Sequence, residues 1–217
     1  EIGDDVHLCT ESGTAVGLLR VEDVYRLDKD SVVQKLTQSH APADASIEKI
    51  ANMRPVLLGG AVQLSRHALS SQGVYEVTPR QMRRVFENRG WSKIARVEDS
   101  DLAYLGDESL HRFVLREQYC DGLFIQLNAG KGNVTSDKVA DAYQSAMRSG
   151  EGAGRIVFGL SAAASRGYGE FRETILRAIV GKNFGCSHVL VDRSPLSEGA
   201  YSPHLIRVIA DMGVAFM

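Results

Sequence analysis

The sequence predicts an α/β protein in two parts: a small β-barrel-like domain in residues 1–77, and a domain of alternating helices and parallel strands in residues 78–217. Residues 1–77 hold short runs of alternating apolar residues separated by turn residues, which is typical of a β domain. From residue 78, five short apolar runs are separated from one another by helical patterns, which favours a parallel sheet with helices on both faces. The composition, 44% hydrophobic and 24% charged, is that of a folded globular protein.

The first part begins with an expected hairpin. Val6–Cys9 forms an alternating run, Glu11–Thr14 is a turn signal, and a second run follows at 15–21 and 24–27. The elements expected after it are helical or irregular inserts at Ser31–Gln38 and Asp44–Asn52, then two strand-like stretches within 55–64 joined through Gly59-Gly60. Because Glu1 begins inside a strand pattern, we expect this domain to be incomplete at its N-terminus.

The second part begins with a helix. Thr78 before Pro79 is typical of a helix N-cap, Met82 and Phe86 lie on one face of the helix, and Gly90 ends it. The other elements expected are strands at 94–97, 122–127, 155–160, 188–191 and 214–217, and helices at 107–120, 136–148, 168–182 and 202–212. Because parallel sheets bind ligands at the carboxyl ends of their strands, we expect the site in the loops after Val97, Leu127, Leu160 and Val191.

Charge and hydropathy exclude some partners. The 25 Lys and Arg residues against 27 Asp and Glu residues give a net charge of −2, so we expect neither nucleic acid nor an anionic membrane as partner. No apolar run approaches the roughly 18 residues of a membrane helix, and residues 1–5 lack the pattern of a signal peptide. We therefore expect a cytoplasmic protein.

Cysteine and histidine residues give no metal or catalytic pattern. Cys9, Cys120 and Cys186 are far apart in the sequence, so we expect three small buried thiols. His188 lies in an expected buried strand and fits a core histidine, whereas His111 is expected at the surface.

Several segments, taken together, resemble the ATP sulfurylases (sulfate adenylyltransferases), whose fold is a PUA-like domain followed by a Rossmann-like nucleotidyltransferase domain. The pattern TPxxxRxxFxxxGW of that family is present from Thr78 to Trp91. The further matching segments are Gly59-Gly60-Ala61-Val62, Asp121-Gly122-Leu123, Tyr168 with Arg172 and Glu173, and Lys182–His188. The resemblance spans most of residues 13–204 and implies the fold.

The same resemblance implies that two functional segments are absent. Family members carry QxRNPxHxxH after the strand that corresponds to 94–97, where cationic and amide side chains hold the triphosphate of ATP. The corresponding stretch here, 100–109, has none of those side chains, and residues 98–108 contain five acidic residues and no Lys or Arg. A carboxylate about 4 Å from a phosphate oxygen costs on the order of 4 kcal/mol even at a dielectric constant of about 20.

The second segment, GRDHAG in the family, corresponds to 192–197. Arg193 is kept, but Asp192 replaces the first glycine and Pro195 replaces the histidine. The family's reaction is attack of sulfate on the α-phosphorus of ATP with loss of pyrophosphate, which depends on positioning and on stabilisation of charge. The departures therefore predict that ordinary sulfate activation is lost.

The remaining candidate site residues fall into two groups. Lys131 in a Gly-Lys-Gly turn, Arg172 and Arg193 would form an anion pocket, with a solvated turn as the alternative for Lys131. Tyr201 and His204 lie in a segment similar to one near the nucleotide in the family. Asp99 and Asp101 would hold Mg²⁺, with a solvated acidic loop as the alternative.

Two functional hypotheses stay open. The first is an ATP-sulfurylase-like protein that binds a nucleotide, a small anionic ligand or a protein partner in the inherited cleft without ordinary catalysis. The second is an active adenylyl or nucleotidyl transferase with a replaced, Mg²⁺-assisted site. The sequence leaves open whether the chain forms a homo-oligomer or is part of a larger protein.

Overall fold

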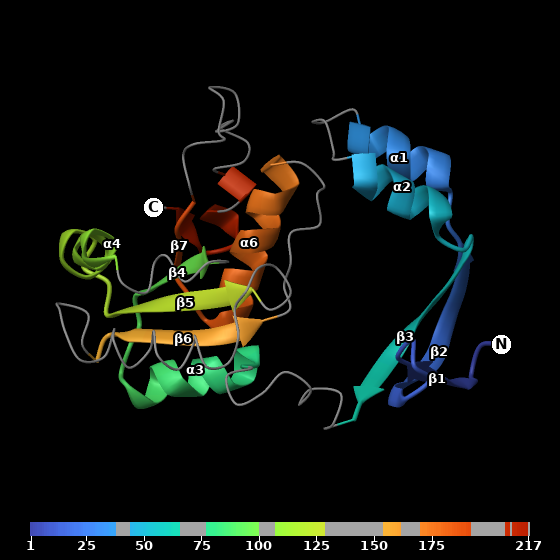
Figure 1. The fold of residues 1–217 in the computed structure, drawn as a ribbon, viewed down its shortest axis with the longest axis horizontal. Coiled ribbons are helices and arrows are strands. Elements are labelled where there is room, and N and C mark those ends of the chain that lie inside the picture. The colour runs from blue at the N-terminus through green and yellow to red at the C-terminus, as the bar shows by residue number, and fades with distance from the viewer. Residues whose placement is uncertain are drawn as a thin grey trace. The chain divides into compact units, whose positions relative to one another are not determined.

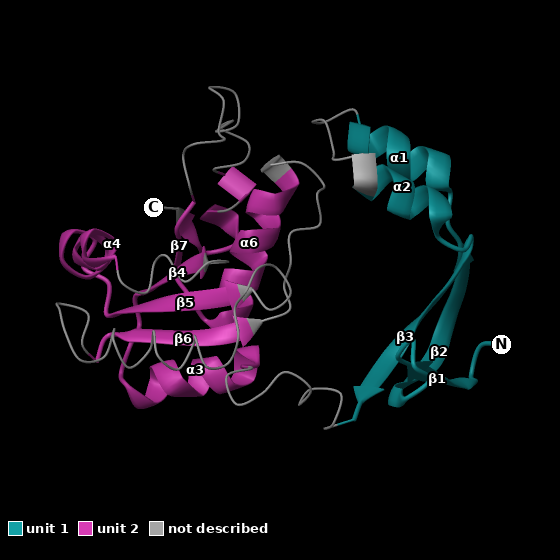
Figure 2. Cartoon of the chain, viewed as in Figure 1, with its two compact units in different colours: residues 1–73, 167–169 teal, residues 74–166, 170–217 magenta. Residues whose placement is uncertain are grey.

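The computed structural model describes residues 1–37, 44–65, 77–99, 107–128, 154–161, 170–191, 207–208 and 210–216. The chain divides into two compact units, which Figure 2 distinguishes by colour. Unit 1 comprises residues 1–73 and 167–169, and unit 2 comprises residues 74–166 and 170–217. The division that the sequence predicts after residue 77 stays a prediction.

Unit 1 contains an antiparallel sheet in the order β1-β2-β3. Its elements are β1 (Asp5–Cys9), β2 (Ala15–Arg26), α1 (Lys29–Thr37), α2 (Asp44–Asn52) and β3 (Val56–Leu64) (Figure 1). The hairpin β1–β2 is confirmed, with Gly13 at φ +84° in its turn. The expected helix at 44–52 is confirmed as α2.

The sequence predicts two strand-like stretches joined through Gly59-Gly60. The structure instead has one strand, β3, that runs through this pair. The register of β2 against β3 shifts between Val21 and Asp23, opposite the glycine pair. A Cβ on Gly60 would lie 1.8 Å from the carbonyl oxygen of Arg20. The glycine therefore allows the close approach of two strands at a bulge, instead of a turn.

Unit 2 is built on a five-stranded parallel sheet in the order β6-β5-β4-β7-β8. The strands are β4 (Ile94–Asp99), β5 (Gly122–Asn128), β6 (Ile156–Ser161), β7 (His188–Val189) and β8 (Ala215–Phe216). Helix α3 (Pro79–Asn88) precedes these strands. The described helices between them are α4 (Glu108–Arg112), the π-helix η3 (Phe113–Glu117) and α6 (Glu170–Phe184) (Figure 1). The predicted parallel sheet is confirmed.

Helices cover both faces of this sheet. Leu123, Ile125 and Leu127 of β5 pack with Val114 and Leu115 of η3, on the α4–η3 face. The intervening Phe124 points the other way and packs with Phe86 of α3 and Phe184 of α6. We call this second side the α6 face.

Helix α3 begins as its sequence predicts. The Thr78 hydroxyl accepts a hydrogen bond from the Gln81 amide, and the Thr78 amide donates to the Gln81 side chain at 2.8 Å, forming a capping box. Gly90, at φ +68°, follows the C-cap residue Arg89 and ends the helix.

Other bounds differ from those expected. The single helix expected at 107–120 is α4 followed by η3, because the helix widens into π-helical turns after Arg112. It ends before Tyr119, which has φ +53°. Strand β4 extends two residues beyond Val97, and β7 and β8 are shorter than expected. The helix expected at 136–148 lies outside the described residues; of the one expected at 202–212, residues 207–208 and 210–211 are helical.

Candidate functional site

The described strands of unit 2 have a topological switch point between β4 and β7. After β4 the chain adds β5 and β6 on one side and then returns to place β7 on the other side. Ligands of open parallel sheets bind at such a point, outside the carboxyl ends of the strands. The segments that follow these two strands in the sequence are residues 100–106 after β4 and 192–206 after β7, which include most of the two stretches where the resemblance implies departures from the family motifs.

The residues predicted for the site are only partly described. Asp99 is the last residue of β4, at the carboxyl edge and in register with Leu127 of β5. Arg172 is half-buried in the first turn of α6, which begins after the segment that leaves the carboxyl end of β6. The other predicted residues, Asp101, Lys131, Arg193, Tyr201 and His204, lie outside the described residues.

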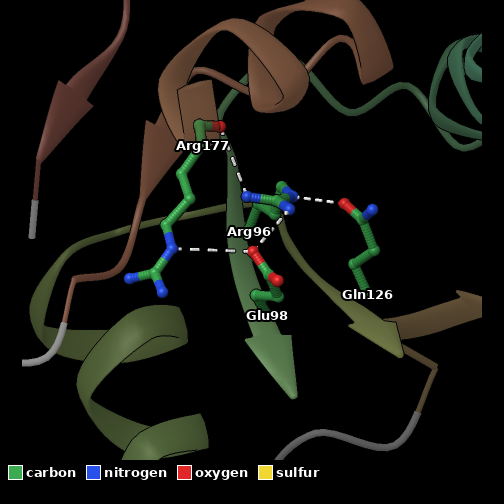
Figure 3. A network of polar contacts seen from close by, with 4 residues as sticks. All are labelled: Arg96, Glu98, Gln126 and Arg177. Atoms are coloured by element: carbon green, nitrogen blue, oxygen red, sulfur yellow. Dashed lines mark hydrogen bonds and ion pairs between the residues drawn. The ribbon is translucent and has the colours of Figure 1, made fainter. Parts of the chain in front are cut away.

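A buried polar network lies immediately beside the switch point, on the α6 face (Figure 3). Arg96 of β4 is 1% exposed, and its Nε donates to Oε1 of Gln126 at 2.5 Å. Its terminal nitrogens donate to Oε2 of Glu98 and to the carbonyl oxygen of Arg177, each at 3.3 Å. Oε2 of Glu98 also lies 3.7 Å from Nε of Arg177. One carboxylate is therefore shared by two guanidinium groups.

The partners of Arg96 come from three elements. Glu98 is two residues further along β4 and so points to the same face, and Gln126 stands beside Glu98 on β5. Arg177 belongs to α6, and Gly181 of the same helix allows α6 to pack closely on the sheet, since a Cβ there would lie 2.7 Å from Cγ2 of Val189 on β7. The network thus ties the two central strands to the helix that covers them.

Burial dominates the electrostatics of this region. Desolvation lowers the pKa of Arg96, and the neighbouring Glu98 carboxylate acts in the opposite direction. Burial raises the pKa of Cys186, next to this guanidinium, to about 12, so that its thiol stays protonated. Within the described residues, Nε2 of Gln126 is a buried side-chain nitrogen without a hydrogen-bond partner.

The structure changes the interpretation of the acidic segment. Glu98 and Asp99 belong to strand β4 instead of the loop after it, and Glu98 is paired with Arg96 and Arg177. Asp107 is the N-cap of α4, where its Oδ1 accepts hydrogen bonds from the amides of Ser109 and Leu110, each at 3.0 Å. Two of the five acids therefore have partners that offset their charge.

Two of the segments that resemble the family, those around Trp91 and Asp121, make structural contacts with each other. Asp121 Oδ2 accepts hydrogen bonds from the amides of Ser92 and Lys93, both at 2.7 Å, and a Cβ on Gly122 would lie 2.3 Å from the Trp91 ring. These backbone hydrogen bonds, with that from Lys93 first, lower the pKa of Asp121. The segments around Trp91 and Asp121 therefore contact each other where the strands begin, away from the carboxyl edge.

The cysteines and histidines correct two expectations. Cys120 and Cys186 are buried as expected, but Cys9 is exposed on β1, and His111 is buried at 5% exposure instead of at the surface. His188 is half-buried; burial, followed by the charge of Lys93, lowers its pKa. The described part of the chain has no cluster of three or more His, Cys, Asp or Glu side chains that could hold a metal ion.

The sequence analysis missed the Arg96 network. A signal was available, because an arginine inside an apolar central strand must find a buried partner, and Glu98 lies on the same strand face two residues later. Arg177 and Gln126 carried no such local signal, since only the packing of α6 and β5 brings them to Arg96.

Known proteins resemble both units. Residues 74–205 match the family model described as ATP-sulfurylase, and residues 1–67 match that of a PUA-like domain. A sulfate adenylyltransferase of Hyperthermus butylicus is 30% identical over 220 residues, which cover 98% of this chain and 56% of that protein. A sulfate adenylyltransferase of Chloroflexus aurantiacus is 32% identical over 208 residues, which cover 93% of this chain and 53% of that protein. The chain spans about half the length of these relatives.

Among solved structures, a hexameric APS kinase from Thiobacillus denitrificans superposes with a TM-score of 0.65 at 19% identity, over 100% of this chain and 38% of that one. At this identity the likeness concerns the fold. Of the helices in the described ranges, none combines the length and apolarity needed to cross a bilayer.

Proposed function

Because the chain belongs to the ATP-sulfurylase family, we propose that it is a sulfate-adenylyltransferase-like protein that binds a nucleotide or another small anionic ligand without ordinary sulfate activation. The observation that carries this proposal is the sequence at the switch point. From Glu98 to Glu108 the chain contains no Lys, Arg or His, although this segment leaves the strand beside which ligands of such sheets bind.

The physical reason concerns the triphosphate. Its transfer chemistry needs cations positioned where negative charge develops. Asp99 ends β4 at this edge and Asp101 follows it, so the segment adds negative charge where the family places cations. Binding of an anionic ligand would then depend on cations from other segments, for which we propose Arg172, Arg193 and Lys131, with Tyr201 and His204 beside the ligand.

The alternative function is a nucleotidyl transferase assisted by Mg²⁺. The position of Asp99 at the end of β4 favours it, because carboxylate oxygens suit Mg²⁺ and the ion would offset their charge toward phosphate. Asp99 and Asp101 would hold the ion, which would polarise a phosphate group when bound.

Isothermal titration calorimetry of the 217-residue chain separates these functions. ATP, adenylyl sulfate and sulfate are each titrated with and without Mg²⁺, into the wild type and into Asp101→Ala. The proposal predicts binding of at least one of these ligands that persists without Mg²⁺ and in Asp101→Ala. Glu87→Ala, which removes an exposed acid from α3 outside the site, is the matched control.

Binding that needs Mg²⁺ and is lost in Asp101→Ala but not in Glu87→Ala would favour the transferase. Absence of binding at millimolar concentrations of all three ligands would overturn both ligand-binding functions and leave a protein partner as the occupant of the cleft.

A further inference from the structure

We infer that Arg177 binds the oxyanion of the ligand at the switch point, and that Glu98 and the buried Arg96 hold it in position. The identity of the ligand rests on the proposed function, whereas the site itself rests on the described contacts. The ligand group that this site fits is a phosphate or sulfate oxyanion.

The side chain of Arg177 is placed for this role. It is 37% exposed, and Figure 3 shows it extending along β4 in the strand direction to reach Glu98, near the carboxyl edge. Strand β7 pairs with β4 only as far as Arg96, which stands opposite Val189. Glu98, which the Arg177 side chain approaches, therefore lies beyond the residues at which β7 pairs with β4.

Arg177 keeps donors for a ligand. A guanidinium carries five N–H groups in one plane. Among the described residues, the side chain of Arg177 contacts an acid only through Nε, at 3.7 Å from Glu98. The two terminal nitrogens can then present a pair of N–H groups to one oxyanion, the arrangement in which arginine recognises phosphate and sulfate.

Glu98 and Arg96 fix the orientation. Arg96, at 1% exposure, cannot reach a ligand, but it holds Oε2 of Glu98, which in turn faces Nε of Arg177. Arg96 itself is held by Gln126 and by the carbonyl oxygen of Arg177. In Figure 3 the terminal nitrogens of Arg177 lie on the side of the guanidinium away from Glu98.

The charge of the network favours an anion. Arg96 and Arg177 contribute two positive charges and Glu98 one negative charge, so these three side chains sum to +1, before the charges of Asp99 and Asp101 are counted. Arg177 is 37% exposed, so water screens part of its attraction for a bound oxyanion, whereas the charges of Arg96 and Glu98 are more buried. The two guanidinium groups on the α6 face would attract an anion, whereas the acidic segment after β4 would repel it.

The test titrates inorganic pyrophosphate and sulfate, and separately ATP, into the wild type and three variants. Arg177→Gln removes the charge, Arg177→Lys keeps the charge without the planar pair of donors, and Lys182→Gln removes an exposed charge from the last turn of the same helix. We expect Arg177→Gln to weaken binding of the tighter inorganic anion about tenfold or more, Arg177→Lys to weaken it less, and Lys182→Gln to change it less than about twofold.

A second readout is the Nε–Hε signal of Arg177 in the wild type, followed by nitrogen-edited NMR during the same titrations. A shift of this signal that saturates with the bound fraction supports direct contact, and it decides the matter if Arg177→Gln fails to fold.

The outcomes separate this inference from the proposed function. Unchanged affinity in Arg177→Gln with an unmoved Nε–Hε signal, while the wild type binds ATP or the anions, overturns the role of Arg177 and leaves the proposed function standing. Arg177-dependent binding of inorganic anions without any binding of ATP supports the oxyanion site and contradicts ATP as the ligand. Absence of binding of every anion overturns both.

Discussion

Arg96 is a charged side chain at the centre of a sheet, and its surroundings show how such a residue is tolerated. A buried charge is costly unless hydrogen bonds and an opposite charge compensate it. Arg96 receives both, from the side chains of Gln126 and Glu98 and from a carbonyl oxygen of α6. Removal of a partner is therefore more damaging than removal of an exposed ion pair.

We predict that Glu98→Gln lowers the free energy of unfolding of unit 2 by about 3 kcal/mol, because the guanidinium of Arg96 then lacks its carboxylate. Arg177→Gln, at a side chain that is 37% exposed, should cost less than about 1 kcal/mol. Trp91 is the single tryptophan of the chain and lies in unit 2, so its fluorescence during denaturant unfolding reports on this unit. Equal losses in the two variants would contradict the role of the Glu98 carboxylate in compensating the buried charge of Arg96.

Asp121 provides a dependence of stability on pH. Its folded pKa is lowered, chiefly by hydrogen bonds from the amides of Lys93 and Ser92, while in the unfolded chain it is about 3.9. The carboxylate therefore stabilises the fold above that value, and the contribution is lost as pH falls through the folded pKa.

We predict that the stability difference between the wild type and Asp121→Asn is constant near neutral pH and shrinks as pH falls below about 4. The asparagine can still accept both amide hydrogen bonds, so the variant should fold. Denaturant unfolding at a series of pH values measures the difference; a difference that does not change with pH would show that the charge of Asp121 contributes nothing.

At the scale of elements, the start of β5 depends on a glycine against the Trp91 ring. We predict that Gly122→Ala destabilises unit 2 by about 1–3 kcal/mol, because the new Cβ would lie 2.3 Å from a rigid ring atom. Gly59→Ala is the control within a strand of unit 1, where the nearest atom would be 3.6 Å away. Circular dichroism during denaturant unfolding, which reports on both units, provides the measurement, and a wild-type unfolding midpoint for Gly122→Ala would refute the steric role.

Elements with a local signal could be predicted from the sequence. Helix α3 has its N-cap at Thr78 and ends before Gly90, so each end is marked by residues within about one helical turn of it. The break into η3 could not be predicted, since no proline or glycine marks it. Strand β3 continues through Gly60 because β2 has a bulge opposite the glycine pair. The two strands are some 40 residues apart in sequence, so no local pattern predicts this pairing.

At the scale of the molecule, the alternation of helix and strand predicted the parallel sheet, which is confirmed. The site at the carboxyl ends of its strands stays a prediction. The resemblance did not find Arg177, since no motif contains it and only the packing of α6 against β4 brings it to Glu98. Both units belong to a fold that supports sulfate adenylyltransferases, so the difference in function that we propose lies in a few side chains at one edge.

The central claim is that this edge binds an anionic ligand without activating sulfate. The most direct measurement is release of pyrophosphate from ATP by the chain in the presence of sulfate and Mg²⁺, with calorimetric titration of ATP and adenylyl sulfate on the same preparation. We predict binding of at least one nucleotide and no sulfate-dependent release of pyrophosphate above the buffer rate. Sulfate-dependent release that is lost in Asp101→Ala, but kept in Glu87→Ala, would contradict the claim and establish the Mg²⁺-assisted transferase.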